Sequence, residues 1–288
     1  MDLSPTPLPA LRHLVDETEA FLIDCDGVLW NAGSLIPGAA EALLALRLRG
    51  KRLFYVTNNS SKSRQTMVER LAAMGVPARQ DEIYTSAWLA ARIAAQRGVR
   101  KAYVMGGEGI VVELAARGIA SAGGPDEPME AVTQADFAAL PVDPDIGAVI
   151  VGWDVRLSYG KLCRAALHLQ VVPGCLFIAT NRDAAILSGG RLMPGGGSMV
   201  AAVEAATGIR PLLAGKPGTE VVDCVVADHG LDRGRLCMIG DRMDTDMALA
   251  AAAGIASLLV LTGITSVADT PPPGVAPTAV APSIAALA

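Results

Sequence analysis

Short runs of strand character recur along this chain, and most of them precede a stretch of helical periodicity that ends at a glycine. Glycine commonly ends a helix because it adopts the left-handed backbone conformation without steric cost. Strands that alternate with helices of this length form a mostly parallel sheet covered by helices. The pattern therefore predicts an α/β fold, with strands at residues 21–23, 53–56, 82–84, 102–105, 148–151, 176–179, 212–214, 236–239 and 257–261.

Other stretches depart from this alternation. Residues 120–128 are rich in glycine, proline and acidic side chains, and residues 188–198 contain five glycines, so we expect loops at both places. Residues 270–282 carry five prolines and are expected to be extended. The longest apolar stretch, residues 247–261, is too short to span a membrane. Because it contains Gly254, it predicts a helix, a glycine stop and a buried strand.

Charge and cysteine content argue against several classes of protein. The chain has 24 basic and 29 acidic residues, and this net charge of −5 is atypical of proteins that bind nucleic acids or anionic membranes. The five cysteines form no C-x-x-C pair, which predicts buried thiols in a reducing compartment and argues against a zinc site. Acidic residues near the N-terminus argue against a signal or transit peptide. We therefore expect a soluble intracellular protein.

The first candidate site residues are Asp24 and Asp26, which directly follow the strand at residues 21–23. Side chains two apart on a strand project to the same side, and the carboxyl edge of an open α/β sheet is where ligands bind. Two carboxylates this close repel each other, and a bound Mg²⁺ would relieve that repulsion. The alternative is an ordinary turn, because aspartate and glycine are both turn formers.

Polar residues also follow two other strands. Thr57, Asn58 and Asn59 end the run at 53–56 and supply hydrogen-bond donors suited to a phosphoryl group, although the serines after them are also typical of a helix cap. Lys216 follows the run at 212–214 and precedes a proline, so its ammonium group is a candidate to neutralise a phosphorylated carboxylate. The spacing does not fit a P-loop, and a lone lysine is most often simply solvated.

A second acidic cluster follows the strand at residues 236–239 and includes Asp241 and Asp246. Carboxylates at a strand end suit metal coordination, whereas an acidic helix N-terminus is the alternative. Because the carboxyl ends of parallel strands share one edge, all four groups together predict a single Mg²⁺-dependent phosphoryl-transfer site.

The order and spacing of these four groups resemble motifs one to four of the haloacid dehalogenase superfamily of phosphatases. The resemblance implies that Asp24 is the nucleophile, which forms an aspartyl-phosphate, and that Asp26 is the general acid and base. It implies that Mg²⁺ is held by Asp24, Asp241 and the main-chain carbonyl of Asp26.

The same resemblance assigns roles to the remaining motif residues. Thr57 and Asn58 would hold the transferring oxygens, with Asn59 beside them, and Lys216 would neutralise their charge. Asp246 would orient Lys216 or a metal-bound water. A doubly wound, Rossmann-like core is implied for residues 1–97 and 206–288, interrupted by an α/β cap domain at residues 98–205.

Three runs of sequence resemble the p-nitrophenyl phosphatase branch, namely residues 24–30, 57–64 and 240–246. Residues 123–126, 175–183 and 195–200 are most similar to plant and algal phosphoglycolate phosphatases. The resemblance therefore implies hydrolysis of a small phosphorylated metabolite, with 2-phosphoglycolate favoured, in photorespiration or metabolite repair.

In this family the cap often pairs two subunits, which implies a homodimer. The chloroplast stroma is an alternative compartment if a transit peptide is absent from this sequence.

Substrate selection leaves alternatives open. The carboxylate of 2-phosphoglycolate calls for one more cation, for which Arg182 and Arg64 are the candidates, although a structural pair of Arg182 with an acid fits as well. Animal pyridoxal phosphatases carry a histidine shortly after the position of Asp183, and this chain does not, which counts against pyridoxal phosphate. A broad-specificity phosphatase is the alternative within the class. A phospho-accepting signalling receiver is the alternative from another class, although receivers are single domains of about half this length.

Overall fold

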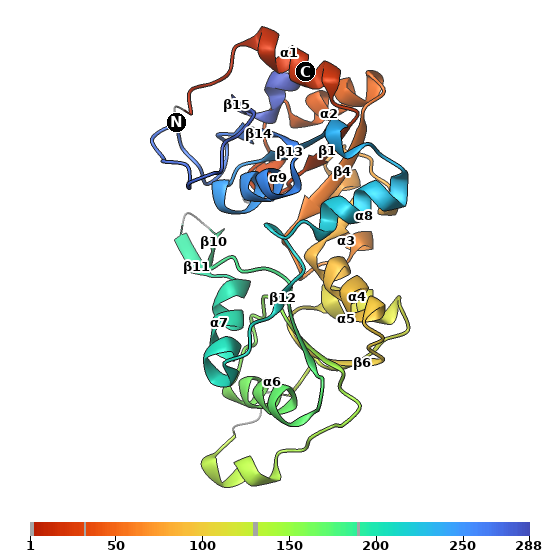
Figure 1. The fold of residues 1–288 in the computed structure, drawn as a ribbon, viewed down its shortest axis with the longest axis vertical. Coiled ribbons are helices and arrows are strands. Elements are labelled where there is room, and N and C mark those ends of the chain that lie inside the picture. Colours follow the sequence, from red (N-terminus) through yellow and green to blue (C-terminus); the bar gives the residue numbers. More distant parts are fainter. Residues whose placement is uncertain (1–2, 32, 129–131, 189–190) are drawn as a thin grey trace. The chain divides into compact units, whose positions relative to one another are not determined.

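The computed structural model describes residues 3–31, 33–128, 132–188 and 191–288 of the protein. The chain divides into two compact units, and each unit has a parallel sheet of its own (Figure 1). Unit 1 comprises Met1–Thr57, Met67–Tyr84 and Lys216–Ala288, and unit 2 comprises Asn58–Thr66 and Thr85–Gly215. The predicted α/β class with mostly parallel sheets is confirmed.

The sheet of unit 1 has six strands in the order β15-β14-β13-β1-β4-β5. Strand β1 pairs in parallel with β4 and β13, and β14 pairs in parallel with β13 and β15. The strands are β1 (Ala20–Ile23), β4 (Arg52–Thr57), β5 (Ile83–Thr85), β13 (Leu236–Gly240), β14 (Ala256–Val260) and β15 (Ala279–Ala281). The helices are α1 (Leu8–Glu17), α2 (Ala39–Leu48), α8 (Glu220–His229) and α9 (Ala248–Ala253), together with most of α3 (Arg64–Ala73). A small hairpin of β2 (Trp30–Asn31) and β3 (Ser34–Leu35) follows β1.

Alternation along the strands builds the core of unit 1. Phe21 and Ile23 of β1 are fully buried and belong to the same apolar cluster as Leu11 of α1, Leu43 of α2 and Leu71 of α3. The predicted helix, glycine stop and buried strand within residues 247–261 are also confirmed. Helix α9 ends at Gly254, whose φ of 67° is left-handed, and β14 follows it directly. Short helical turns complete the unit: η1 (Gln80–Glu82), η3 (Arg233–Arg235), the π-helical turn η4 (Met243–Met247) and η5 (Ile284–Leu287).

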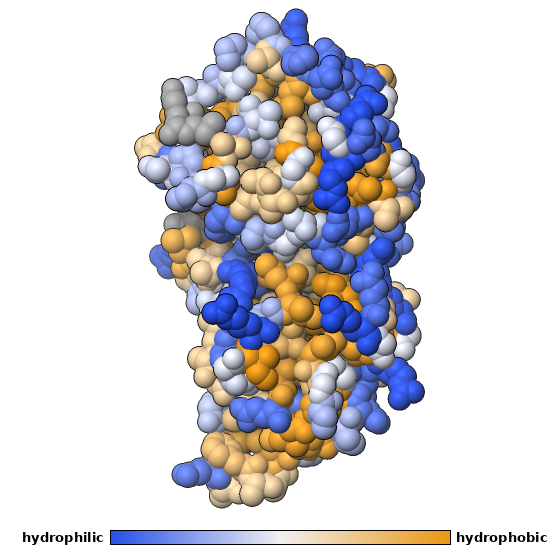
Figure 2. All heavy atoms as spheres, in the orientation of Figure 1, coloured by the Kyte–Doolittle hydropathy of each residue, from blue (hydrophilic) through white to orange (hydrophobic). Residues whose placement is uncertain are grey.

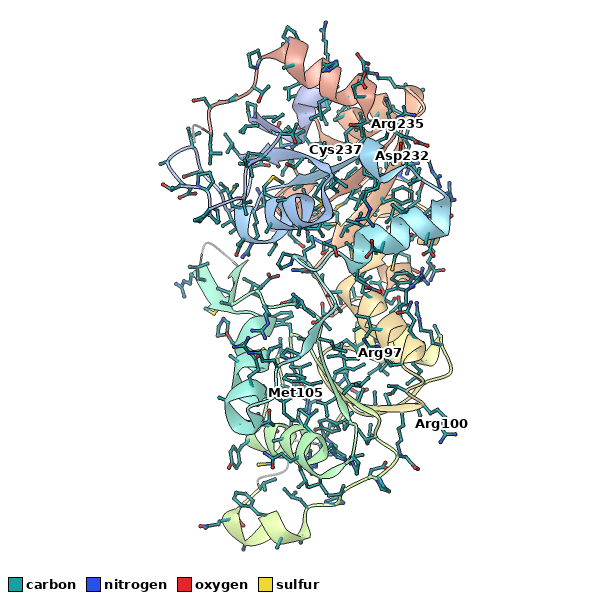
Figure 3. All side chains as sticks on the ribbon, viewed as in Figure 1. Arg97, Arg100, Met105, Asp232, Arg235 and Cys237 are labelled. Atoms are coloured by element: carbon teal, nitrogen blue, oxygen red, sulfur yellow. The ribbon has the colours of Figure 1, made fainter. Side chains whose placement is uncertain are left out.

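Unit 2 contains a five-stranded parallel sheet in the order β12-β9-β8-β6-β7. Its strands are β6 (Lys101–Met105), β7 (Ala120–Gly123), β8 (Ala148–Val151), β9 (Leu176–Ala179) and β12 (Leu212–Leu213). Helices α6 (Tyr159–Val171) and α7 (Gly196–Thr207) cover one face of this sheet, and α4 (Ser86–Gln96) and α5 (Glu108–Ala115) pack together beside it (Figure 1). Met105, the last residue of β6, is fully buried (Figure 3).

The unit boundaries differ from the domain limits expected from the sequence. Helix α4 belongs to unit 2 because it packs against α5, although it lies before residue 98. Residues 206–215 also belong to unit 2 because β12 pairs with β9. The sequence pattern marks strands and helices but does not show which sheet a terminal helix or strand joins.

Two stretches that were expected to be loops contain regular structure in part, although residues 124–128 form turns as expected and residues 189–190 lie outside the described residues. Residues 120–123 form the edge strand β7. The stretch at 188–198 was expected to be a loop, but it contains β11 (Arg191–Pro194), which pairs with β10 (Ala185–Ser188) in an antiparallel hairpin, and the start of α7. The glycines at residues 195–197, where α7 starts, serve close packing, since a Cβ on Gly197 would lie 2.4 Å from the main-chain oxygen of Arg182. Glycine therefore marks a helix start here and not a flexible connection.

The expectation of buried thiols holds for three of the five cysteines. No helix in the described residues is long and apolar enough to cross a membrane. Figure 2 shows that the turn η2 (Gln134–Ala139), at the foot of the view, carries mostly apolar side chains, of which Phe137 is exposed. All five cysteines are free thiols; Cys25, Cys224 and Cys237 are buried, the last on β13 (Figure 3), and the other two are half-buried.

Candidate active site

Three adjacent strands of unit 1 end in polar side chains. The parallel register pairs Ile23 of β1 with Tyr55 of β4 and with Ile239 of β13. The backbone N–H of Asp24 continues the ladder by donating to the carbonyl of Ile239 at 2.9 Å. Asp24 and Asp241 therefore directly follow β1 and β13, and Thr57 is the last residue of β4, which pairs with β1. All three side chains are buried at one edge of the sheet. This is the edge at which open α/β sheets bind ligands.

Lys216 joins two of the acidic residues at this edge. Its Nζ lies 2.7 Å from Asp24 Oδ1 and 2.7 Å from Asp246 Oδ1, and it donates to the main-chain oxygen of Val56 at 3.3 Å. Burial alone would lower the pKa of Lys216, but the two carboxylates outweigh it, so its pKa lies above its usual value. The lysine is therefore a buried, permanently charged ammonium group and not the solvated lysine of the alternative interpretation.

Asp24, Asp241 and Asp246 form an acidic cluster whose carboxylate oxygens lie within 4.8 Å of one another. Burial, reinforced by the neighbouring acids and opposed by Lys216, raises the pKa of Asp24 well above its usual value. Burial and Asp246 raise the pKa of Asp241 to about 7. Three buried carboxylates face one ammonium group, so the cluster carries an excess of negative charge that protons or a cation must balance.

The oxygens of this cluster fit a divalent cation. Asp241 Oδ2 accepts from the N–H of Ile264 at 2.7 Å, whereas its Oδ1 is buried and has no hydrogen-bond partner in the described part of the chain. A buried carboxylate oxygen without a donor is available as a metal ligand, and hard cations such as Mg²⁺ prefer such oxygens. Asp246 is more fully engaged, because its second oxygen accepts from the N–H of Arg242 at 3.1 Å.

Two glycines make room for the Asp241 carboxylate. A Cβ on Gly27 would lie 2.5 Å from Asp241 Oδ2, and a Cβ on Gly263 would lie 1.8 Å from the same oxygen. Both distances are far shorter than real carbon–oxygen contacts allow. Gly27 also has a φ of +85°, which disfavours any other residue. The loop around Gly263 was not identified as part of the site from the sequence, because its only local signal is a glycine after a strand.

Asp26 lies at the exposed side of this edge. Its Oδ1 accepts a hydrogen bond from the indole Nε1 of Trp30 at 2.8 Å, and Trp30 itself is fully buried. Asp26 therefore has access to solvent and a fixed orientation at the same time. Trp30 is a second residue that the sequence did not identify as functional, because a tryptophan in an apolar turn is typical of a core position.

The two asparagines of the second motif belong to unit 2. Asn58 Nδ2 donates to both carboxylate oxygens of Asp183, at 3.2 and 3.3 Å. The carbonyl of Asn58 accepts from Ser86 Oγ at 2.7 Å and from Asn181 Nδ2 at 2.8 Å. Asn59 Oδ1 accepts from the N–H and hydroxyl of Ser61, which is a local turn. Their contact with a phosphoryl group stays a prediction.

The two candidate arginines both have acidic partners within unit 2. Arg182 Nη2 lies 2.5 Å from Glu204 Oε1, with its side chain 46% exposed. Arg64 Nε lies 3.5 Å from Glu113 Oε2, and its guanidinium group stacks 5.1 Å from the ring centre of Trp88. Either arginine would have to share or exchange its acidic partner to bind a substrate carboxylate.

The fold and the cluster define a class of protein. The site combines a buried aspartate paired with lysine, a second carboxylate two residues later, and an acidic cluster suited to a cation. This combination is typical of enzymes that transfer phosphoryl groups through a carboxylate.

Comparison with known proteins leads to the same class. Residues 21–120 match the model of the haloacid dehalogenase-like hydrolase family, and residues 213–287 match a second hydrolase model of that kind. The human glycerol-3-phosphate phosphatase is 41% identical over 90% of this chain and 83% of its own. The chloroplastic phosphoglycolate phosphatase 1A of Arabidopsis thaliana is 40% identical over 88% of this chain and 72% of its own.

A solved structure extends the likeness to the fold. The glycerol phosphate phosphatase of Mycobacterium tuberculosis, in complex with magnesium, has a TM-score of 0.78 and 31% identity, and the match covers 95% of this chain and 77% of that one. Proteins named 4-nitrophenylphosphatase are also among the matches. The chain belongs to the haloacid dehalogenase-like hydrolases and is a phosphatase of that family.

Proposed function

We propose that the protein is a Mg²⁺-dependent phosphomonoester hydrolase that acts through an aspartyl-phosphate at Asp24, and that 2-phosphoglycolate is its substrate. The observation that carries the mechanism is the pairing of buried Lys216 with Asp24 and Asp246, each at 2.7 Å. This pairing keeps Lys216 charged beside the carboxylate that becomes phosphorylated.

In the first step a carboxylate oxygen of Asp24 attacks phosphorus, and the bond from phosphorus to the leaving oxygen breaks. Protonated Asp26 gives its proton to that oxygen, so the alcohol leaves as a neutral molecule. Lys216 offsets the negative charge of the phosphoryl group, and Thr57 donates to one of its oxygens. Asp246 holds Lys216 in place throughout.

In the second step Asp26, now ionised, takes a proton from water as the water oxygen attacks phosphorus. The bond to Asp24 breaks, inorganic phosphate leaves, and both aspartates return to their starting states. Asp24, Asp241 and the carbonyl of Asp26 would hold Mg²⁺, which when bound supplies positive charge beside the phosphoryl oxygens.

The choice of substrate rests on two supports. The runs at residues 123–126, 175–183 and 195–200 resemble phosphoglycolate phosphatases, and three such plant proteins are about 40% identical to this chain. Arg182, and Arg64 as the second candidate, would bind the substrate carboxylate. Glycerol 3-phosphate is the competing substrate, because phosphatases of that name in several animals are equally similar to this chain.

Initial rates on a panel of phosphate esters with Mg²⁺ test this proposal. The panel contains 2-phosphoglycolate, glycerol 3-phosphate, pyridoxal 5′-phosphate and p-nitrophenyl phosphate, and Asp24→Asn serves as the blank. We expect kcat/KM for 2-phosphoglycolate to exceed the other values by at least about tenfold. A preference for glycerol 3-phosphate or a flat profile would refute the substrate, and activity that persists in Asp24→Asn would refute the nucleophile.

A paired variant tests the carboxylate contact. Arg182→Ala should lower turnover of 2-phosphoglycolate by about tenfold or more. Turnover of p-nitrophenyl phosphate, which has no carboxylate, should stay within about twofold of the wild-type value. An equal effect on both esters would show that Arg182 serves only its pair with Glu204.

The signalling-receiver interpretation does not fit this chain. The receiver interpretation called for a single domain, whereas the described chain has two units and belongs to a hydrolase family. The homodimer and the compartment, whether cytoplasm or chloroplast stroma, stay predictions from the resemblance.

A further inference from the structure

We propose that Trp30 is a positioning residue for Asp26. Its indole N–H holds Oδ1 of the carboxylate, so that Oδ2 is the oxygen that carries the proton in both steps of the reaction. This inference rests on the proposed role of Asp26 as general acid and base. It adds Trp30 to the residues that support the reaction, with an effect on kcat/KM that depends on the leaving group of the substrate.

The hydrogen bond between the two side chains gives each carboxylate oxygen a different task. Trp30 Nε1 donates to Asp26 Oδ1 at 2.8 Å. An indole N–H can only donate, so Oδ1 must act as the acceptor whichever protonation state Asp26 has. The carbonyl oxygen of a protonated carboxyl group is a better acceptor than its hydroxyl oxygen, so the hydrogen of protonated Asp26 is favoured on Oδ2. Because Asp26 is exposed whereas Trp30 is fully buried, Oδ1 points toward the core and Oδ2 is left for the reacting groups.

The turn between these residues makes their contact rigid. Gly27 N–H donates to the carbonyl of Trp30 at 2.9 Å, and Leu29 N–H donates to the carbonyl of Cys25 at 2.8 Å. Gly27 allows the reversal with its φ of +85°. Trp30 then starts β2 and packs into the apolar cluster of unit 1. The indole is thus fixed by the core and not by Asp26, as a positioning group must be.

Arg70 of α3 completes the arrangement. The carbon at the centre of its guanidinium group lies 4.3 Å from the centre of the Trp30 ring. A cation over the ring face is attracted by the negative potential of that face, and it leaves the N–H at the ring edge free to donate. A positive charge on the face also polarises the indole and so strengthens the N–H as a donor.

This arrangement should matter most for poor leaving groups. The alkoxide of an alkyl phosphate needs a proton as its bond to phosphorus breaks, whereas nitrophenolate leaves without one. The value of kcat/KM reports the steps up to release of the leaving group. A misplaced Asp26 should therefore lower kcat/KM for an alkyl phosphate and leave kcat/KM for p-nitrophenyl phosphate nearly unchanged.

Trp30→Phe removes the N–H and keeps an aromatic ring beneath Arg70. We expect kcat/KM for the best alkyl phosphate of the wild type to fall about tenfold, less than the 10²–10⁴-fold that general acid catalysis as a whole supplies. For p-nitrophenyl phosphate we expect a change within about twofold. Trp153→Phe is the matched control, because it removes an indole hydrogen bond to the carbonyl of Pro194 at 3.2 Å in unit 2. It should leave the ratio of the two kcat/KM values unchanged.

An equal loss on both esters, or no loss on either, would overturn the inference. If Trp30→Phe does not fold, replacement of Trp30 by benzothienylalanine keeps the ring shape without the N–H, and the same ratio decides. Asp26→Asn distinguishes failure of the proposed function from failure of this inference. If Asp26→Asn also leaves the ratio unchanged, Asp26 is not the general acid. If Asp26→Asn changes the ratio and Trp30→Phe does not, the role of Trp30 alone is refuted.

Discussion

Gly263→Ala is expected to weaken Mg²⁺ binding, because the added methyl group would displace the carboxylate of Asp241. The Cβ of the new alanine would lie 1.8 Å from Asp241 Oδ2, and ordinary contact begins at 3.4 Å. The carboxylate or the loop must therefore move by about 1.6 Å. Mg²⁺ demands ligand distances of about 2.0–2.1 Å, with a tolerance of about 0.2 Å, so the displacement is several times what the ion accepts.

The loop cannot easily give way, because it is bonded to the same aspartate. Ile264 N–H donates to Asp241 Oδ2 at 2.7 Å, and Thr265 N–H donates to the main-chain oxygen of Asp241 at 3.1 Å. Loss of a group that orients a metal ligand typically costs 10–100-fold in affinity. We expect the dissociation constant for Mg²⁺, measured by calorimetry on the substrate-free protein, to rise by about that factor.

The phosphatase assay gives a second measurement of the same effect. At increasing Mg²⁺, the variant should need about 10–100-fold more metal to reach half of its own maximal rate. Gly234→Ala is the control, since among the described residues a Cβ there comes near Asp232 Oδ1 alone, at an ordinary 3.4 Å, and it should bind Mg²⁺ as the wild type does. If Gly263→Ala binds Mg²⁺ within twofold of the wild type, Asp241 is not a ligand or the loop is not rigid, and the reasoning fails.

Two further predictions concern stability. Lys161 is fully buried in unit 2, where its Nζ donates to Asp154 Oδ2 at 2.7 Å and to the carbonyl of Gly124 at 3.0 Å. Lys161→Met should lower the free energy of unfolding, measured with urea, by about 3–5 kcal/mol, because it leaves the buried carboxylate of Asp154 without its cation. Adding Asp154→Leu should restore most of that loss. A double variant that is as unstable as Lys161→Met would contradict this. The second prediction follows from Asp241, whose pKa is about 7 in the folded, metal-free protein and 3.8 by reference. Between about pH 4 and 7 the folded state binds the extra proton, so stability in EDTA should fall as the pH rises through this window. Urea unfolding at pH 5 and pH 7.5 measures this fall in stability. The prediction is wrong if the wild type loses no more stability between the two pH values than Asp241→Asn does.

The strand ends were predictable from the sequence because their signal is local. Asp24, Thr57 and Asp241 each follow an apolar run, and a parallel sheet brings such positions to one edge whatever its strand order. The hairpin of β10 and β11 was not predictable, because glycines on both sides of Arg191–Pro194 and the proline at its end are typical of a loop. The division of the chain depends on which strand β12 pairs with, and neighbouring residues do not encode that pairing.

The groups that support the site are harder to identify than those that carry the chemistry, and the reason is physical. A catalytic aspartate or lysine breaks the rule that buried side chains are apolar, so it stands out in an apolar run. Trp30 and Gly263 obey ordinary rules, one as a core aromatic and the other as a glycine after a strand. Their roles arise from what lies opposite them in space: Asp26 is four residues from Trp30 across a turn, and Asp241 is 22 residues from Gly263. The residues that carry the chemistry of such a site can therefore be identified from the sequence, whereas the residues that support them are identified only from the distances between side chains.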